Sequence, residues 1–296
     1  MEPKKGLEVA KKGELLEKEE EVRKAPEAVY YLRLNLYHRY LHGMVIVSFL
    51  GLVATGMPLK FSHTRWAVWL SHFLGGFETA GFFHRVFALM TFLYFGFHLG
   101  YVAYLLLVRK ETGLFWGPNS MVPQPKDFIE IYQHFRWFLG LGPRPRFERW
   151  TYWEKFDYWA VFWGIAIIGS SGLFLWFPTF FARFFPGWVF NIALIVHSDE
   201  ALLAAAFIFT VHFFNTHLRP ESFPFDPVIF TGRVTEEELI KKHPAEYERM
   251  VLEGTLERYR AEPPPLWLRN FSWIVGFSAL GIGLVLLFLI VLTLFR

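Results

Sequence analysis

The chain contains no cysteine among its 296 residues. Disulfides, iron–sulfur clusters, thiolate zinc sites and covalently attached c-type haem all require cysteine, so this protein can form none of them. Histidine is the main alternative ligand, and the chain has 11 histidines. Any metal chemistry in this protein is therefore expected to use imidazole.

Charge is also scarce, and the uncharged stretches are apolar. Only 19% of the residues are charged, against about 25% in an average globular chain. An α-helix rises about 1.5 Å per residue, so roughly 20 uncharged residues cross the hydrocarbon layer of a bilayer. Four stretches reach this length, at residues 40–59, 86–108, 158–182 and 270–295.

A fifth apolar stretch, from Phe184 to Leu218, is interrupted only by Asp199 and Glu200. A helix satisfies its backbone polar groups internally, which lets it carry such a sequence through lipid. We therefore predict an all-α integral membrane protein, with a four-helix bundle and a fifth, C-terminal helix that serves as an anchor or docks a partner. The expected spans are residues 40–59, 83–108, 157–177, 188–217 and 270–295.

The segments between the helices divide the chain further. A charged tail over residues 1–38 mixes Lys, Arg and Glu in near balance, which argues against a nucleic-acid-binding arm. The core covers 39–218 and includes segment 109–157, where Trp, Tyr and Phe alternate with Arg as is typical of the lipid headgroup level. A charged segment at 219–269 precedes the last helix, 270–296.

Lysine and arginine are distributed unevenly between the two sides of these helices. With the first helix running outward, 30 − 5 = 25 of them fall on the side of the N-terminus. The positive-inside rule then places the N-terminus in the cytoplasm and the C-terminus outside. The five external residues are Lys60, Arg65, Arg85, Arg183 and Arg296.

Seven histidines lie within or at the ends of the first, second and fourth predicted helices. Ionisable groups are costly in hydrocarbon, so an intramembrane histidine indicates a functional site. A single one is more often a hydrogen-bonded core residue than a ligand, but several at matching depths favour ligation. The seven are His38, His42, His84, His98, His197, His212 and His217.

The spacing of these histidines indicates two levels. His84 and His98 are 14 residues apart in the second helix, a rise of about 21 Å. His197 and His212 are 15 apart in the fourth, which crosses the membrane in the same direction. Facing imidazoles at two depths can hold haem irons, one near each membrane face. The outer level has one pair, His84 with His197, and the inner level has five candidates: His38, His42, His98, His212 and His217.

Several glycines in these helices permit close approach to the backbone. They fit either a planar macrocycle or ordinary helix packing, and the sequence does not separate the two. They are Gly43, Gly51, Gly56, Gly96, Gly100, Gly164, Gly169 and Gly172.

Other polar residues flank the predicted haem levels. Arg39 and Arg85 suit haem propionates, although arginines at helix ends also snorkel to the interface. Asp199 and Glu200 lie beside His197 on the outer side. They suit hydrogen bonds to a ligand imidazole or a haem propionate, or a proton relay. The alternative is that they are simply acids in the first turn of a helix near water. On the inner side, the candidates for guiding protons or orienting quinone are Glu154, Asp157, Asn215, His217 and Arg219. The alternative is that Glu154 or Asp157 only forms an interfacial salt bridge with Lys155 or Arg149.

Four segments carry a family resemblance. HRYLHGMVIVSFLGLVATGMP at 38–58 resembles the first helix of the cytochrome b (gamma) subunits of respiratory formate dehydrogenases. EKFDYWAVFWGIAIIGSSGLFLWFP at 154–178 resembles their third helix, and VFNIALIVHSDEALLAAAFIFTVHFFNTHLRP at 189–220 their fourth. GRVTEEELIKKHPAEYER at 232–249 is similar to their cytoplasmic tail. HFFNTHLRP and RWTYWEKFDYW are also similar to b-type subunits associated with multihaem cytochromes c.

The resemblance implies a four-helix di-haem core. His84 and His197 would ligate the outer haem, and His42 and His212 the inner haem. The step from His197 to His212 is 15 residues where the family pattern has 14, which predicts a π-bulge in the fourth helix. His98 has no counterpart in that pattern. Three roles are open for it: to replace His42 as the partner of His212, to contact quinone, or to ligate a third haem.

The sequence thus predicts a cytochrome b that carries electrons through two or three b-type haems. It would connect menaquinone or ubiquinone with an external redox partner, either a dehydrogenase with its iron–sulfur subunit or a multihaem cytochrome c. We expect a subunit of an oxidoreductase complex in the inner membrane of a bacterium or archaeon, with the direction of electron flow open. The alternative is a haem-free membrane anchor or transporter subunit whose histidines bind quinone, metal or protons.

Overall fold

The structure is a computed structural model that describes residues 28–295. It is mostly helical, and five of its helices are long and apolar enough to cross a membrane. The five predicted spans are confirmed, and most begin earlier than the uncharged stretches because helix formation continues into polar sequence. The chain therefore has the helices of a multi-pass membrane protein. The spans are Leu36–Lys60, Phe77–Leu107, Tyr152–Trp176, Trp188–Leu218 and Leu266–Leu294.

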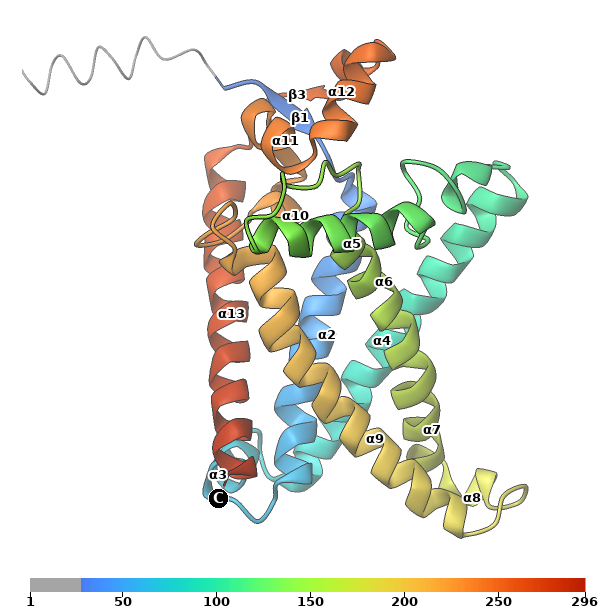
Figure 1. Cartoon of the computed structure of the whole chain (residues 1–296). Helices are drawn as coiled ribbons and strands as arrows, with labels where there is room; N and C mark the ends of the chain where they lie inside the picture. Colours follow the sequence, from blue (N-terminus) through green and yellow to red (C-terminus); the bar gives the residue numbers. More distant parts are fainter. Residues whose placement is uncertain (1–27, 296) are drawn as a thin grey trace, which may run out of the picture.

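The five spans run side by side and alternate in direction (Figure 1). A small sheet lies at one end, which we call the cap end, and the opposite end, which we call the loop end, carries only short helices. The first, second and fifth spans are single helices: α2 (Leu36–Lys60), α4 (Phe77–Leu107) and α13 (Leu266–Leu294). The loop end carries α3 (Arg65–Phe73) and α8 (Pro178–Phe181).

The third and fourth spans contain π-helical segments. The third consists of α6 (Tyr152–Gly164), a π-segment at Ile165–Gly169 and α7 (Ser170–Trp176). The fourth consists of α9 (Trp188–Phe207) and two π-segments, Ile208–His212 and Phe214–Leu218. The π-bulge predicted between His197 and His212 is thus confirmed, whereas the one in the third span was not expected. Each bulge inserts a residue and so changes which side chains share a helix face.

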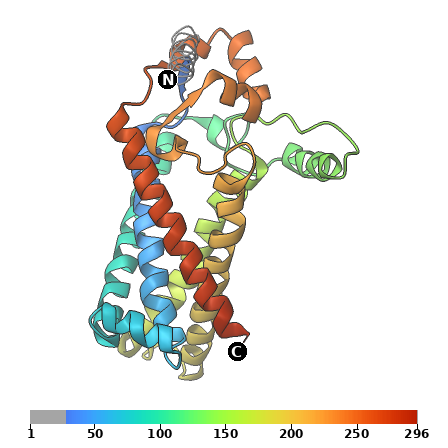
Figure 2. The same ribbon diagram turned by 90° about the vertical axis from the view of Figure 1, so that its left-hand side faces the viewer.

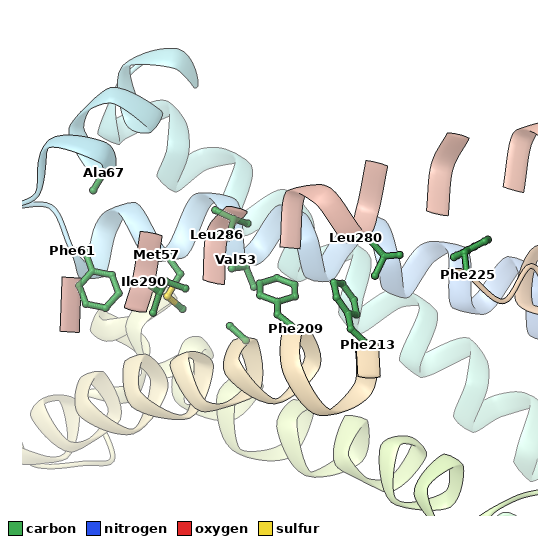
Figure 3. Packing of buried hydrophobic residues seen from close by; sticks show 11 residues of the cluster. Val53, Met57, Phe61, Ala67, Phe209, Phe213, Phe225, Leu280, Leu286 and Ile290 are labelled. Carbon is green, nitrogen blue, oxygen red and sulfur yellow. The ribbon is translucent and has the colours of Figure 1, made fainter. Parts of the chain in front are cut away.

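A core joins α2, the fourth span and α13 (Figure 3). Lipid tails are as apolar as these side chains, so close packing rather than exclusion of water holds membrane helices together. Gly283 of α13 provides that closeness, because a Cβ there would lie 2.7 Å from the Phe209 ring and 2.8 Å from the Phe213 ring. The other core members drawn from the three spans include Val53, Met57, Leu280, Leu286 and Ile290.

The cap consists of residues 28–35 and 219–265. Its antiparallel sheet has the order β2-β1-β3, so the strand that precedes the first span pairs with two strands that follow the fourth. The sequence assigned residues 1–38 to a charged tail, but 28–35 contain β1 and 36–38 begin α2. Residues 1–27 of that expected tail lie outside the described residues. The elements are β1 (Tyr30–Leu32), α10 (Val228–Thr231), β2 (Arg233–Thr235), α11 (Glu236–Lys242), α12 (Pro244–Leu252), a 3₁₀ turn (Leu256–Tyr259) and β3 (Arg260–Ala261).

A buried ion cluster ties the cap to the connection between the second and third spans. Glu246 accepts from Arg33 at 2.6 Å and from Arg149 at 3.0 Å. His243 donates from Nδ1 to the carbonyl oxygen of Glu148 at 2.8 Å. Since removal of one partner leaves a buried charge uncompensated, such a cluster holds its segments in one arrangement.

Helix α5 (Pro125–Phe138) runs crosswise to the long helices at the cap end (Figure 1) and stands out from them on one side (Figure 2). It follows a 3₁₀ turn at Thr112–Leu114. Its polar side is buried, where Asp127 accepts from Lys155 at 2.8 Å and burial raises the pKa of Glu130 to about 7. Its opposite side is apolar and exposed, as suits a helix at a lipid interface. The exposed side chains are Phe128, Ile129, Tyr132, Phe135 and Phe138.

The buried His243 predicts that the cap loses stability in mild acid. Burial, with Arg33 nearby, lowers the pKa of His243 well below 6.5. The unfolded cap therefore takes up a proton that the folded cap excludes, and the free energy of unfolding should fall by about 2 kcal/mol between pH 8 and pH 5. Hydrogen-exchange protection of α11 and α12 measures this change. His243→Asn, whose amide can donate the same bond, should remove most of the slope, and an unchanged slope would contradict the assignment.

Candidate functional site

A cavity of about 1590 Å³ extends along the inside of the molecule. It is lined mainly by apolar side chains of α2, α4, the third span and the fourth span, and it reaches from Arg33 at the cap end to Lys60 at the loop end. Sites for one small molecule usually have about 300–1,000 Å³. This cavity therefore has room for more than one ligand.

Two pairs of histidines face each other across this cavity. The ring centroids of His84 and His197 are 6.1 Å apart near the loop end. Those of His42 and His212 are 6.4 Å apart near the cap end. The structure thus brings together the outer pair expected from spacing, and of the inner candidates it places His42 against His212.

Both separations fit two ligands on opposite sides of one metal ion. With metal–nitrogen bonds of about 2.0 Å and about 1.1 Å from each nitrogen to its ring centre, the two centroids lie about 6.2 Å apart. A direct hydrogen bond between two imidazoles would bring the centroids to about 5.2 Å. The observed 6.1 Å and 6.4 Å agree with the first arrangement.

At the loop end, hydrogen bonds determine which ring nitrogen is free. The hydroxyl of Thr55 donates to the carbonyl of Gly51 at 2.7 Å, so toward His84 Nδ1, at 3.0 Å, it accepts. His197 Nδ1 donates to the carbonyl oxygen of Ile168 at 2.9 Å. Both rings therefore carry their hydrogen on Nδ1 and keep the lone pair of Nε2, the nitrogen that can bind a metal.

The cap-end pair is held differently. His212 Nδ1 donates to Oδ2 of Asp157 at 2.9 Å, which again leaves Nε2 with its lone pair. His42 Nδ1 is buried and has no hydrogen-bond partner among the described residues, and the same is true of Asp157 Oδ1. The two pairs thus share a spacing and differ in the charge that surrounds them.

Two glycines make room for the imidazoles of the loop-end pair. A Cβ at Gly56 would lie 3.0 Å from His84 Cε1, and one at Gly172 would lie 2.9 Å from His197 Cε1. By contrast, Gly51 and Gly169 meet phenylalanine rings of neighbouring helices, which is ordinary close packing. The sequence could not distinguish these uses. No heavy atom lies within 4 Å of a Cβ built at Gly43, Gly96 or Gly100.

His98 lies between two tyrosines and not in either pair. Its Nδ1 is 2.9 Å from the Tyr37 hydroxyl and its Nε2 is 2.8 Å from the Tyr158 hydroxyl. All three side chains line the cavity. Because both ring nitrogens already have partners, His98 is the weaker candidate for a metal ligand.

The other sequence candidates are spread around the cap end and the loop end. His217 Nδ1 accepts from the backbone N–H of Asp226 at 3.3 Å, and Asn215 lines the cavity. Arg85 also lines the cavity, at the loop end. Arg39 instead donates from Nε to the carbonyl of Phe230 at 2.6 Å.

The acidic candidates have partners other than those expected. Glu154 caps α6 by accepting from the Thr151 hydroxyl at 2.7 Å. The proposed salt bridges of Glu154 or Asp157 with Lys155 or Arg149 are absent from residues 28–295. Lys155 instead binds Asp127, and Arg149 binds Glu246.

At the loop end, Asp199 pairs with Lys60 at 2.6 Å rather than with His197, and Glu200 lines the cavity. The sequence reasoning missed Thr55, Tyr37 and Tyr158 as partners of cavity histidines. The Thr-Gly at 55–56 was a visible signal, since it combines the hydroxyl and the open space that His84 uses.

Within residues 28–295, no group of three or more His, Asp or Glu side chains could hold a metal ion. Each histidine pair thus supplies two protein ligands only. Comparison of the chain with protein-family models and with curated proteins gave no match.

The two crowded glycines give a test that does not depend on any bound group. Gly56→Ala and Gly172→Ala should each lower the free energy of unfolding by about 1–3 kcal/mol, because the new methyl group overlaps an imidazole. Gly43→Ala and Gly96→Ala, in open helix positions, should be neutral or stabilising by up to about 1 kcal/mol. Thermal unfolding in detergent measures all four. Equal Tm values would show that the imidazoles do not depend on these glycines.

Proposed function

We propose that this chain is a membrane cytochrome b that holds two b-type haems, one between His84 and His197 and one between His42 and His212. The observation that carries the proposal is the separation of the two pairs, 6.1 Å and 6.4 Å, across a common cavity. When bound, the two haems would supply one-electron carriers near the two faces of the membrane.

The number of protein ligands favours haem over a bare metal ion. A structural zinc ion takes four protein ligands, whereas each pair provides two. A porphyrin supplies the remaining, in-plane nitrogens itself, and its apolar body suits the lining of this cavity. Arg85, which lines the loop end of the cavity, is the proposed partner of a propionate.

The arrangement of the spans supports the same assignment. The histidines belong to α2, α4 and the fourth span, and the third span contributes Asp157 and the Ile168 carbonyl. These four spans would form the haem-binding bundle, with α13 packed outside it against α2 and the fourth span. This is the organisation expected from the resemblance to the formate dehydrogenase gamma subunits and to the b-type subunits associated with multihaem cytochromes c.

The cap end is the proposed site of quinone chemistry. Reduction of a quinone takes two protons with two electrons, so the site needs a hydroxyl or imidazole that can exchange protons. A neutral imidazole has one N–H and one lone pair, so one of Tyr37 and Tyr158 donates to His98 and the other accepts. The accepting tyrosine keeps its own hydroxyl hydrogen free for a third group, such as a quinone carbonyl. Tyr158 follows Asp157, which binds His212, so this group lies beside the cap-end pair.

In the cell, the chain would work as one subunit of an oxidoreductase complex in a bacterial or archaeal inner membrane. The excess of Lys and Arg on the side of the N-terminus favours an orientation with the cap end in the cytoplasm and the C-terminus outside. Menaquinone or ubiquinone would react at the cap end. The redox partner, a dehydrogenase or a multihaem cytochrome c, would dock at the loop end.

The haem proposal predicts a definite spectrum and definite ligands. The purified protein should show a sharp α-band on reduction and about two haems per chain. His197→Ala and His212→Ala should each remove one haem, because each leaves an iron with a single protein ligand. Pyridine haemochrome analysis of the folded, monodisperse variants measures the loss. The control is His98→Ala, which should keep both haems.

A stably folded preparation without Soret absorption would overturn the proposal and favour the haem-free anchor or transporter. Loss of a haem in His98→Ala, with both haems retained in His42→Ala, would show instead that His98 is the ligand at the cap end.

The quinone site has a separate test. Tyr158→Phe removes one hydroxyl from the proton-exchanging group and should slow reduction of the haems by a soluble quinol about tenfold or more, with the haem content unchanged. Stopped-flow absorbance of the α-band measures the rate. Tyr104→Phe is the matched control, since Tyr104 lies on the same helix as His98 with its side chain exposed. An unaltered rate in Tyr158→Phe would place the quinone elsewhere.

A further inference from the structure

The four ligand histidines differ in what holds their Nδ1 atoms. At the loop end the acceptors are the hydroxyl of Thr55 and the backbone carbonyl of Ile168, and both are neutral. At the cap end the acceptor is the carboxylate of Asp157, at 2.9 Å from His212. One charged group therefore distinguishes the two ends of an otherwise similar arrangement.

The charge of Asp157 is not balanced by a nearby cation. Within residues 28–295, Asp157 forms no ion pair with Lys or Arg, and its Oδ1 is buried without a partner. The side chain of Asp157 is 14% exposed, so water screens it little. Its sequence neighbour Lys155 is bound to Asp127.

The cations that line the cap end of the cavity each bind another carboxylate. Arg144 and Arg219 both bind Glu221, at 2.5 Å and 3.0 Å. Lys242 binds Asp226 at 2.6 Å, and Arg149 binds Glu246. Two of these carboxylates are each shared by two arginines, because Glu246 also binds Arg33. Among the described residues none of these cations pairs with Asp157, which is the charged group in direct contact with His212.

A carboxylate that accepts from the distal nitrogen of a ligand imidazole makes that imidazole a stronger donor to the metal. It also places a negative charge near the metal, and in a medium of low dielectric constant such a charge acts strongly. Both effects stabilise ferric over ferrous iron and so lower the reduction potential. At the loop end, Arg85 and Glu200 line the cavity with opposite signs.

We infer that Asp157 is a positioning residue that, through His212, holds the reduction potential of the cap-end haem below that of the loop-end haem. This inference rests on the proposed function. Electrons that enter at the cap end then move downhill toward the loop end. The chain is arranged for oxidation of a quinol at the cap end and delivery of electrons to an acceptor at the loop end.

The test is a redox titration of the haem-loaded protein, followed by optical and electron paramagnetic resonance spectroscopy. His197→Ala, which keeps only the cap-end haem, assigns the two potentials, and the cap-end value should be the lower one. Asp157→Asn keeps the size of the side chain and an oxygen that accepts from His212, but it removes the charge. It should raise the cap-end potential by an amount equal to a tenfold or greater change in the ferric/ferrous equilibrium, about 59 mV or more for one electron.

Two control variants and one further spectroscopic readout separate charge from structure. Asp157→Glu restores the charge and should bring the potential back toward the wild-type value. Thr55→Val, which removes the neutral acceptor of His84, should leave the cap-end potential unchanged. Asp157→Asn should also shift the g-values of the cap-end ferric haem, which a purely structural role of Asp157 would not require.

The outcomes distinguish failure of this inference from failure of the proposed haem-binding function. Absence of haem from the wild-type protein would defeat the proposed function itself. Two bound haems with the cap-end potential the higher, or with no shift in Asp157→Asn, would overturn the inference alone. If Asp157→Asn fails to retain the cap-end haem, the inference is tested by the two wild-type potentials alone. A cap-end potential above the loop-end potential overturns it.

Discussion

Polar groups in the hydrocarbon layer have no water as a partner, and the arrangement of this protein follows from that constraint. Each imidazole in a span must find a hydrogen bond inside the protein, or bind a ligand. Three of the four paired histidines find an acceptor for Nδ1 in a neighbouring span or in the π-segment of the third span. All four side chains also line the cavity that the helices enclose. The same bonds that make the histidines tolerable in lipid therefore fix the orientation of three of these rings.

The two ends of the cavity differ in the polar groups that surround the histidines. At the loop end the histidines bond to neutral acceptors, and two glycines make room for their rings. Lys60 and Asp199 form an ion pair there. The cap end combines the Asp157 carboxylate, the tyrosines beside His98 and a folded cap with its buried ion cluster. The cavity histidines therefore bond to a carboxylate and two tyrosine hydroxyls at the cap end, but only to neutral acceptors at the loop end.

Sequence patterns predict the spans and one histidine pair well, because both depend on local properties. Uncharged length gives the five helices, and depth along a helix brings His84 level with His197. The choice of His42 over His98 depends on how α2 and α4 are rotated about their axes relative to the fourth span. The π-segment that begins at residue 208 changes which side chains of that span point toward them. The partner of Asp157 and the pairing of β1 with β2 depend on contacts over 55 and about 200 residues. No periodicity encodes such contacts, and charge alone favoured the wrong partners, Lys155 and Arg149.

The pairing of β1 also imposes an order on synthesis. Tyr30 and Tyr31 leave the ribosome before the first span, but their strand partners, Thr235 and Ala261 among them, follow only after four spans have been made. The cap can therefore close only when those spans are in place. Correct folding of the cap thus depends on the first four spans having been made, although its first strand precedes all of them in the chain.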